Sequence, residues 1–386
     1  MKYKRMISKT ITIFFLITIL NTNFAYATDK ILESQMETLN ISSFIKKGEE
    51  YSKNVFPDIS GDKLLDSAIK GKVDKNGIFN NILSILGKEV VNSITLLGSI
   101  IIVIVIHSIL KSITENIGNE SISEIAYYIE YILIATLIMT SFSGIIGLIR
   151  ESMNNLIGLT TSLVPILLAL MVATGNVVSA GFLETTILFA VVFIGNIITT
   201  VILPITLVAN ALGIISNISE KIQIGKLATF FKSGVIWFLG FVIVIFVSIL
   251  SLEGTLTSSV DRNNSKRNKN SSRYIYTSCG KSTSEILQIW FFGCASLLKN
   301  AVGVVGMIII VGIVAFPIIK LAILTVSYHF VAAICEPMAD KKIISLLEQM
   351  GGTFKILLGI MFFIAALLII GLAMTVKISN ASLMYR

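Results

Sequence analysis

The chain has 386 residues, of which 54% are hydrophobic and 14% charged, whereas an average soluble domain has about 25% charged residues. With apolar runs of about eighteen residues or more, this composition excludes an ordinary soluble domain and predicts an all-α polytopic membrane protein. The net charge of +8 indicates basic membrane flanks and not a nucleic-acid-binding surface.

The N-terminus has the three parts of a secretory signal. Lys2 and Arg5 belong to a basic head, an apolar core runs from Ile11 to Leu20, and Ala25-Tyr26-Ala27 fits a small-x-small cleavage site. We therefore predict a cleavable signal peptide over residues 1–27, with an uncleaved anchor as the alternative. In both cases the following residue starts outside the cytoplasm.

Residues 28–90 form a polar region with apolar residues at helical spacing, such as Ile41, Phe44 and Ile45. This pattern predicts amphipathic helices and therefore a small helical extracytoplasmic N-terminal region. Two interpretations are compatible with it: a cap that lies on the membrane, and a docking surface for extracytoplasmic partners.

Membrane spans are predicted over 91–251 (about five) and 300–386 (two further spans and a short tail). The seven apolar segments are 93–110, 127–149, 155–174, 182–212, 230–251, 301–328 and 354–376. The fourth is too long for one straight span. Pro204 divides it, with Asn196 and Asn210 on either side, which indicates either a broken helix or one span plus a re-entrant piece.

Seven crossings from an outside start place the C-terminus and a loop over 252–299 in the cytoplasm. The basic residues of that loop obey the positive-inside rule. Lys221, Lys226, Lys232, Lys341 and Lys342 then fall outside, against the rule.

No catalytic motif is present, and the chain has only two histidines, so we predict no enzyme and no cofactor. The three cysteines form no CxxC pair, and we predict no metal site. Ionisable residues at Glu130, Glu184, Lys320 and Glu336 lie in or beside apolar spans. They indicate either a proton or ion path or structural charges near the membrane surfaces.

The segments that carry a family resemblance are Ser251–Thr255, Leu297–Gly306 (LLKNAVGVVG), Phe316–Lys320 and Glu336–Asp340. They resemble the stage III sporulation protein AE family of endospore-forming bacteria, and the resemblance extends over nearly the whole chain. The family pattern implies no catalytic residues. The positions that match it are Lys299, Asn300, Gly303, Gly306, Pro317, Lys320, Glu336, Pro337 and Asp340.

The resemblance implies an integral membrane component of a mother-cell-to-forespore channel or secretion-like complex. Such a protein lies in the mother-cell membrane around the forespore, supports late forespore (sigma-G) gene expression and acts by assembly with other membrane proteins. The alternative is a permease-like transporter of a small solute or ion. Its site would lie near Asn196, Pro204 and Asn210 and near Pro317 and Lys320, because interrupted helices commonly build such sites.

Residues 262–292 depart from the family pattern. The stretch RNNSKRNKNSSRYIYTSCGK is polar and basic, yet codons can be chosen for it that read GITAKETKTAVDTFIPVVGK one base later, which resembles the family pattern. We infer compensated single-base insertions or deletions, with a divergent basic loop as the alternative. A polar segment of this composition is expected to be poorly ordered over 262–285.

Overall fold

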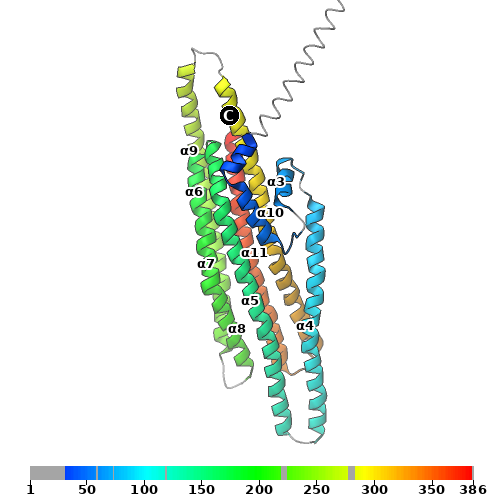
Figure 1. Cartoon of the computed structure of the whole chain (residues 1–386). Coiled ribbons are helices and arrows are strands. Elements are labelled where there is room, and N and C mark those ends of the chain that lie inside the picture. The colour runs from blue at the N-terminus through cyan, green and yellow to red at the C-terminus, as the bar shows by residue number, and fades with distance from the viewer. Residues whose placement is uncertain are drawn as a thin grey trace, which may run out of the picture.

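The fold is all-α, as predicted. A computed structural model describes residues 31–57, 60–72, 74–117, 120–218, 224–276 and 283–384, and every regular element in these ranges is helical. The predicted signal peptide lies outside the described residues. Figure 1 shows one elongated bundle of long helices with two short helices against its side.

The short N-terminal helices follow a helical stretch over 31–38. They are α2 (Ile41–Ser52) and α3 (Gly61–Ile69). The backbone N–H of Gly61 donates to the carboxylate of Glu49, which fixes the start of α3 against α2. Both helices bury one face and expose the other, as expected for amphipathic helices.

The long helical elements follow in chain order: α4 (Lys75–Ile117), α5 (Glu120–Ala173), α6 (Val177–Leu188), η1 (Phe189–Ile194), α7 (Gly195–Ile197), η2 (Ile198–Ile202), α8 (Leu203–Ile218), α9 (Gly225–Tyr276), α10 (Thr283–Cys335) and α11 (Lys341–Met384). The elements from α6 to α8 form one continuous rod. The described chain thus has six rods, each long and apolar enough to cross a membrane. Successive rods run in opposite directions (Figure 1).

The two segments expected as separate spans, 127–149 and 155–174, lie on one helix, α5, so the described chain has six candidate spans where seven apolar segments were expected. Arg150, Glu151 and Asn154 between the two apolar segments are exposed on the surface of this helix. No glycine or proline lies between Gly147 and Gly158, so nothing in that stretch ends a helix. The correction reverses the direction of every later span relative to the N-terminal region.

The break expected at Pro204 does not occur. The rod continues through it, and two π-helical stretches, η1 and η2, come directly before it. Proline has no N–H and its ring clashes with the carbonyl four residues earlier, and a wider π turn relieves that crowding. Within η2, the Thr200 hydroxyl donates to the Asn196 carbonyl at 2.6 Å.

The segment 252–299 was expected to form a loop, but its backbone is helical over 252–276 and 283–299. The backbone of α9 stays helical to Tyr276, and α10 begins at Thr283. The backbone over 262–276 and 283–285 is helical, and residues 277–282 lie outside the described part, so the poor order expected for 262–285 stays a prediction. Polar residues can extend a helix that an apolar segment has already nucleated, because each added residue forms one hydrogen bond without a new nucleation cost.

The N-terminal helices are part of the bundle wall. Ile41, Phe44 and Ile45 of α2 are at most 1% exposed and belong to the main core. Glycines permit this close approach: a Cβ on Gly158 of α5 would lie 2.9 Å from the Tyr51 hydroxyl. The Nζ of Lys47 also donates to Ser162 Oγ at 3.2 Å. The N-terminal region thus packs into the bundle and is not a detached cap.

Candidate functional site

A polar seam joins α8 to α11 inside the bundle. Asn210 of α8 is fully buried, and its side-chain oxygen lies 3.3 Å from the Thr353 hydroxyl, whose proton it shares with the Gln349 carbonyl of α11 at 2.9 Å. The Gln349 amide donates to the Asn210 carbonyl at 3.3 Å. The Asn217 amide donates to Gln349 Oε1 at 3.1 Å. These bonds link the two helices over about two turns.

The seam depends on a close approach of the two helices. A Cβ atom on Gly213 would collide with the Gln349 amide, so a side chain at this position would displace that amide from α8. The Ser345 hydroxyl extends the seam to Asn217 Oδ1 at 3.4 Å. Amide and hydroxyl bonds of this kind hold transmembrane helices together. The arrangement therefore fixes the geometry of α8 against α11.

An ion pair joins α4 to α10. Lys320 Nζ lies 3.7 Å from Oε2 of Glu89, whose side chain is 7% exposed. The Asn92 amide donates to Glu89 Oε1 at 3.3 Å. The ammonium group also lies 5.6 Å from the ring centre of Phe316, within the range of a cation–π contact. Lys320 is thus held between α4 and α10.

The LLKNAVGVVG segment lies at a three-helix contact. A Cβ on Gly303 would lie 2.6 Å from Val376 of α11, and one on Gly306 would lie 2.7 Å from Leu163 of α5. These glycines act in close helix packing, as expected. Lys299 is fully buried, and Asn300 Oδ1 has no hydrogen-bond partner among the described residues.

The Glu336–Asp340 segment is the turn between α10 and α11. Pro317 is accommodated inside α10, whereas α10 ends at Cys335, two residues before Pro337. The N–H groups of Met338 and Ala339 donate to the Cys335 carbonyl at 2.9 and 2.8 Å. Asp340 directly precedes α11, a position at which aspartate is favoured.

The remaining predicted positions do not converge. Glu130 is buried in α5, and Glu184 lies in α6, where only its backbone is described. Asn196 and Pro204 are exposed on the outside of the bundle, whereas Asn210 is buried in the polar seam. These three positions of the fourth span therefore do not share one environment, and the transporter site expected there stays a prediction.

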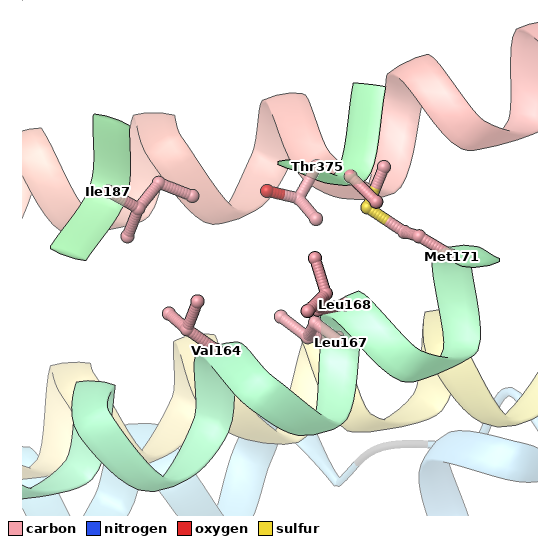
Figure 2. A pocket seen from close by; sticks show the side chains of 7 residues that line it. Val164, Leu167, Leu168, Met171, Ile187 and Thr375 are labelled. Carbon is pink, nitrogen blue, oxygen red and sulfur yellow. The ribbon is translucent and has the colours of Figure 1, made fainter. Parts of the chain in front are cut away.

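Two cavities between the helices are mainly apolar, whereas an open groove of ≈ 580 Å³ along α5 also has Tyr131, Thr136, Thr140 and Ser143 in its lining. Figure 2 shows the first cavity, between α5, α6 and α11, where Val164 and Leu168 of α5 face Thr375 of α11. Its volume is ≈ 10 Å³, about the size of one water, and the Thr375 hydroxyl donates within its own helix to the Gly371 carbonyl. A second cavity of ≈ 210 Å³ between η2–α8 and α9 is lined by apolar residues and Gly234.

Within the described ranges, no group of three or more His, Cys, Asp or Glu side chains is placed to hold a metal ion. The polar groups that the helices bring together are instead pairs and chains between neighbouring helices.

Sequence reasoning missed several members of these contacts. Gln349 and Thr353 are four residues apart, and so lie on one face of an otherwise apolar helix. That spacing was a usable signal for a polar seam. Glu89 was missed because it lies at the boundary of an amphipathic region, where a carboxylate is ordinary.

Comparisons with known proteins support the family resemblance that these segments carry. A family model described as stage III sporulation protein AE matches residues 59–379. The chain is 25% identical over 305 residues to the stage III sporulation protein AE of Bacillus subtilis (strain 168), covering 79% of this chain and 76% of the relative. No solved structure matches. Because the family model spans most of the chain, this protein belongs to the stage III sporulation protein AE family.

Proposed function

We propose that the protein is an integral membrane component of the channel or secretion-like complex between mother cell and forespore. It acts by assembly with other membrane proteins of that complex and not by catalysis. In this role it supports late forespore gene expression under sigma-G from the mother-cell membrane around the forespore. Family membership supports the sporulation context.

One structural observation supports assembly over solute transport. Asn210, Thr353 and Glu89 are buried, and each contacts a polar group of a neighbouring helix. Transporters place such groups around a substrate near the middle of the membrane. Here they fix helix positions, as a component that presents fixed outer faces to partners requires.

The experiment is affinity purification of the tagged full-length protein from sporulating cells in mild detergent. The expected result is co-purification of other membrane proteins of the sporulation complex, together with loss of sigma-G reporter activity in a strain that lacks the gene. An unrelated multi-pass protein with the same tag is the control. Recovery of the protein alone, with normal reporter activity in the deletion strain, would falsify the proposal.

The transporter alternative has a separate test. The purified protein is reconstituted into liposomes, and solute or ion flux is measured. Flux through the protein alone, lost on Asn210→Leu, would favour the transporter.

A further inference from the structure

An apolar pocket opens on the outside of the bundle between η2–α8 and the first half of α9, and its volume is ≈ 210 Å³. Figure 1 shows these helices together at the side of the bundle away from α4. Val201 and Ile205 line one wall and Phe230, Gly234 and Phe238 the other, and every lining residue is apolar or a glycine. Val201 and Phe230 are exposed. The pocket is therefore reached from outside the bundle and is separate from the polar contacts described above.

Gly234 keeps the pocket open. A Cβ atom on this glycine would meet nothing within 4 Å in the described part of the chain. The next residue, Val235, is buried toward the bundle, so α9 still packs beside the pocket. A larger side chain at position 234 would extend into the pocket and not into a packed neighbour.

The pocket lies at hydrocarbon depth. The candidate span Gly225–Leu252 contains its whole α9 wall, and no Asp, Glu, Lys or Arg occurs from Ser233 to Leu252. Phe230 and Phe238 are about 12 Å apart along a helix axis, less than half the thickness of a hydrocarbon core of about 30 Å. The pocket thus fits within one leaflet, the one on the side of the turn between α8 and α9.

A lipid chain suits this pocket better than water. The apolar side chains of the lining cannot hydrogen-bond with water, and an apolar cavity of about 150 Å³ in another protein stays dry and binds benzene. At this depth a bilayer supplies acyl chains. A chain that enters the pocket gains van der Waals contacts with both walls, and an unfilled pocket lacks those contacts.

The rim of the pocket favours a flexible occupant over a helix. Phe230 and Trp237 lie on one face of α9, because seven residues make about two turns, and they are 70% and 72% exposed. A straight helix of a second copy or of another protein would meet these rings first and stay clear of the pocket. An acyl chain can bend past them.

A lysine lies one turn from the pocket, on the side of the membrane surface. Lys226 is exposed and precedes Phe230 by four residues, so the two side chains share one face of α9. Helical side chains lean toward the N-terminus of their helix, which takes the Lys226 ammonium group toward the turn between α8 and α9. Lys232 lies deeper and is half-buried, and its long side chain can extend in the same direction. The charge at this rim complements a phosphate.

We infer that this pocket is a lipid site. It takes one acyl chain of a phospholipid, and the phosphate group of that lipid lies beside Lys226 at the membrane surface. The chain occupies the space between Val201 and Ile205 on one wall and Gly234 on the other. The site does not depend on the partners of the protein in sporulation, so failure of the lipid experiments is distinct from failure of the proposed function.

The first experiment counts retained lipid. The full-length protein is purified from bacterial membranes in mild detergent, and native mass spectrometry measures phospholipid per chain. The wild-type protein should keep one phospholipid. Gly234→Leu should lower the occupancy about tenfold, as expected for the lost contacts of about two methylene groups. Gly240→Leu is the matched control, since Gly240 is an exposed glycine of α9 with nothing within 4 Å in the described ranges.

Absence of retained phospholipid from the wild-type protein, or equal occupancy in the two glycine variants, would overturn the proposal. Val201→Phe narrows the pocket from the opposite wall and should also lower the occupancy, so it replaces Gly234→Leu if that variant does not fold. Elution profile and thermal unfolding in detergent check the folding of each variant.

The second experiment locates the lipid in the unmodified protein. The protein is reconstituted in vesicles that contain phosphatidylglycerol with a diazirine near the end of one acyl chain, and light crosslinks the two. Peptide mass spectrometry should find the label on residues 197–205 and 230–238. A label restricted to other faces, such as the exposed Ile102 and Ile106 of α4, would overturn the site. So would a lipid-free dimer in which a second copy covers the pocket.

Lys226→Gln tests the phosphate contact. Titration of the delipidated protein with phosphatidylglycerol in detergent should give an affinity about fivefold weaker for this variant, the usual effect of one lysine near anionic lipid. Lys341→Gln, on an exposed lysine at the start of α11, should leave the affinity unchanged. Equal affinities of the two variants would contradict the position of the phosphate beside Lys226.

Discussion

Gly312 of α10 faces the ring of Phe56 so closely that a Cβ atom on Gly312 would lie 2.8 Å from Phe56 Cε2 and 2.8 Å from the Cβ of Ser52. Neither atom is the free end of a flexible side chain. An atom added to Gly312 would force Phe56 or Ser52 to move, so the N-terminal region is tightly packed against α10.

Gly312→Ala should loosen the N-terminal region from α10. The expected cost is about 1–3 kcal/mol, typical of overpacking, and α2 should become cleavable by protease in detergent. Gly240→Ala on α9 is the matched control, because a Cβ there meets nothing within 4 Å and alanine favours a helix by up to about 1 kcal/mol. Equal melting temperatures and protease resistance of both variants would contradict the tight contact.

Lys320→Met should destabilise the protein because it leaves the buried Glu89 carboxylate without its ion-pair partner. Breaking a buried pair costs about 3–5 kcal/mol, and the one-third exposure of Lys320 puts the expected loss at the lower end. The double variant Glu89→Gln/Lys320→Met should recover much of the loss. Thermal unfolding in detergent measures both, with Lys355→Met, on an exposed residue, as control. Additive losses in the double variant would show that the pair is not coupled.

Asn210→Leu should weaken the polar seam between α8 and α11. It removes the acceptor of the Thr353 hydroxyl, and such bonds contribute about 0.6 kcal/mol on average and up to about 1.7 kcal/mol in membrane proteins. A double-mutant cycle with Thr353→Val measures the coupling by unfolding in detergent. Asn196→Leu, on an exposed site, should have a smaller effect. A zero coupling energy in the cycle would rule out the bond as a stabilising contact.

The C-terminal ends of α4, α8 and α10 lie at one end of the bundle, opposite α2 (Figure 1). Lys111, Lys221, Lys226, Lys341 and Lys342 are near that end in sequence, so the positive-inside rule makes it cytoplasmic. We therefore expect a green fluorescent protein inserted after Asp340 to fluoresce. Alkaline phosphatase inserted between α9 and α10 should be active. Phosphatase activity after Asp340 would restore the seven-span topology.

The nucleotide sequence of residues 262–292 tests the reading-frame hypothesis. We expect codons that give the family-like text when read one base later. Resequencing of the gene together with peptide mass spectrometry of the protein distinguishes a sequencing error from a real mutation. Codons that do not yield GITAKETKTAVDTFIPVVGK in the shifted frame would leave the divergent segment as the native sequence.

The sequence was sufficient for the fold class, because long apolar runs and amphipathic spacing depend only on local composition. It was insufficient at Arg150 and Glu151, where charges between two apolar runs looked like a loop but lie on one uninterrupted helix. Pro204 was misleading for a similar reason, since a preceding π turn absorbs its geometry without breaking the rod.

The polar contacts were the hardest to predict. Whether Asn210 meets Gln349, or Lys320 meets Glu89, depends on the register of helices far apart in sequence. Single residues carry no information about that register. Predictions made for each span separately therefore identified polar residues but could not identify the residues they contact on other helices.

The position of α2 has a consequence for how the chain is made. Its buried face is completed by α5 and by α10, and α10 is synthesised more than two hundred residues later. Until α10 has entered the membrane, Phe44 and Ile45 have only part of their packing partners. The N-terminal region thus reaches its final position as one of the last steps of biogenesis, although it is the first of these segments to leave the ribosome.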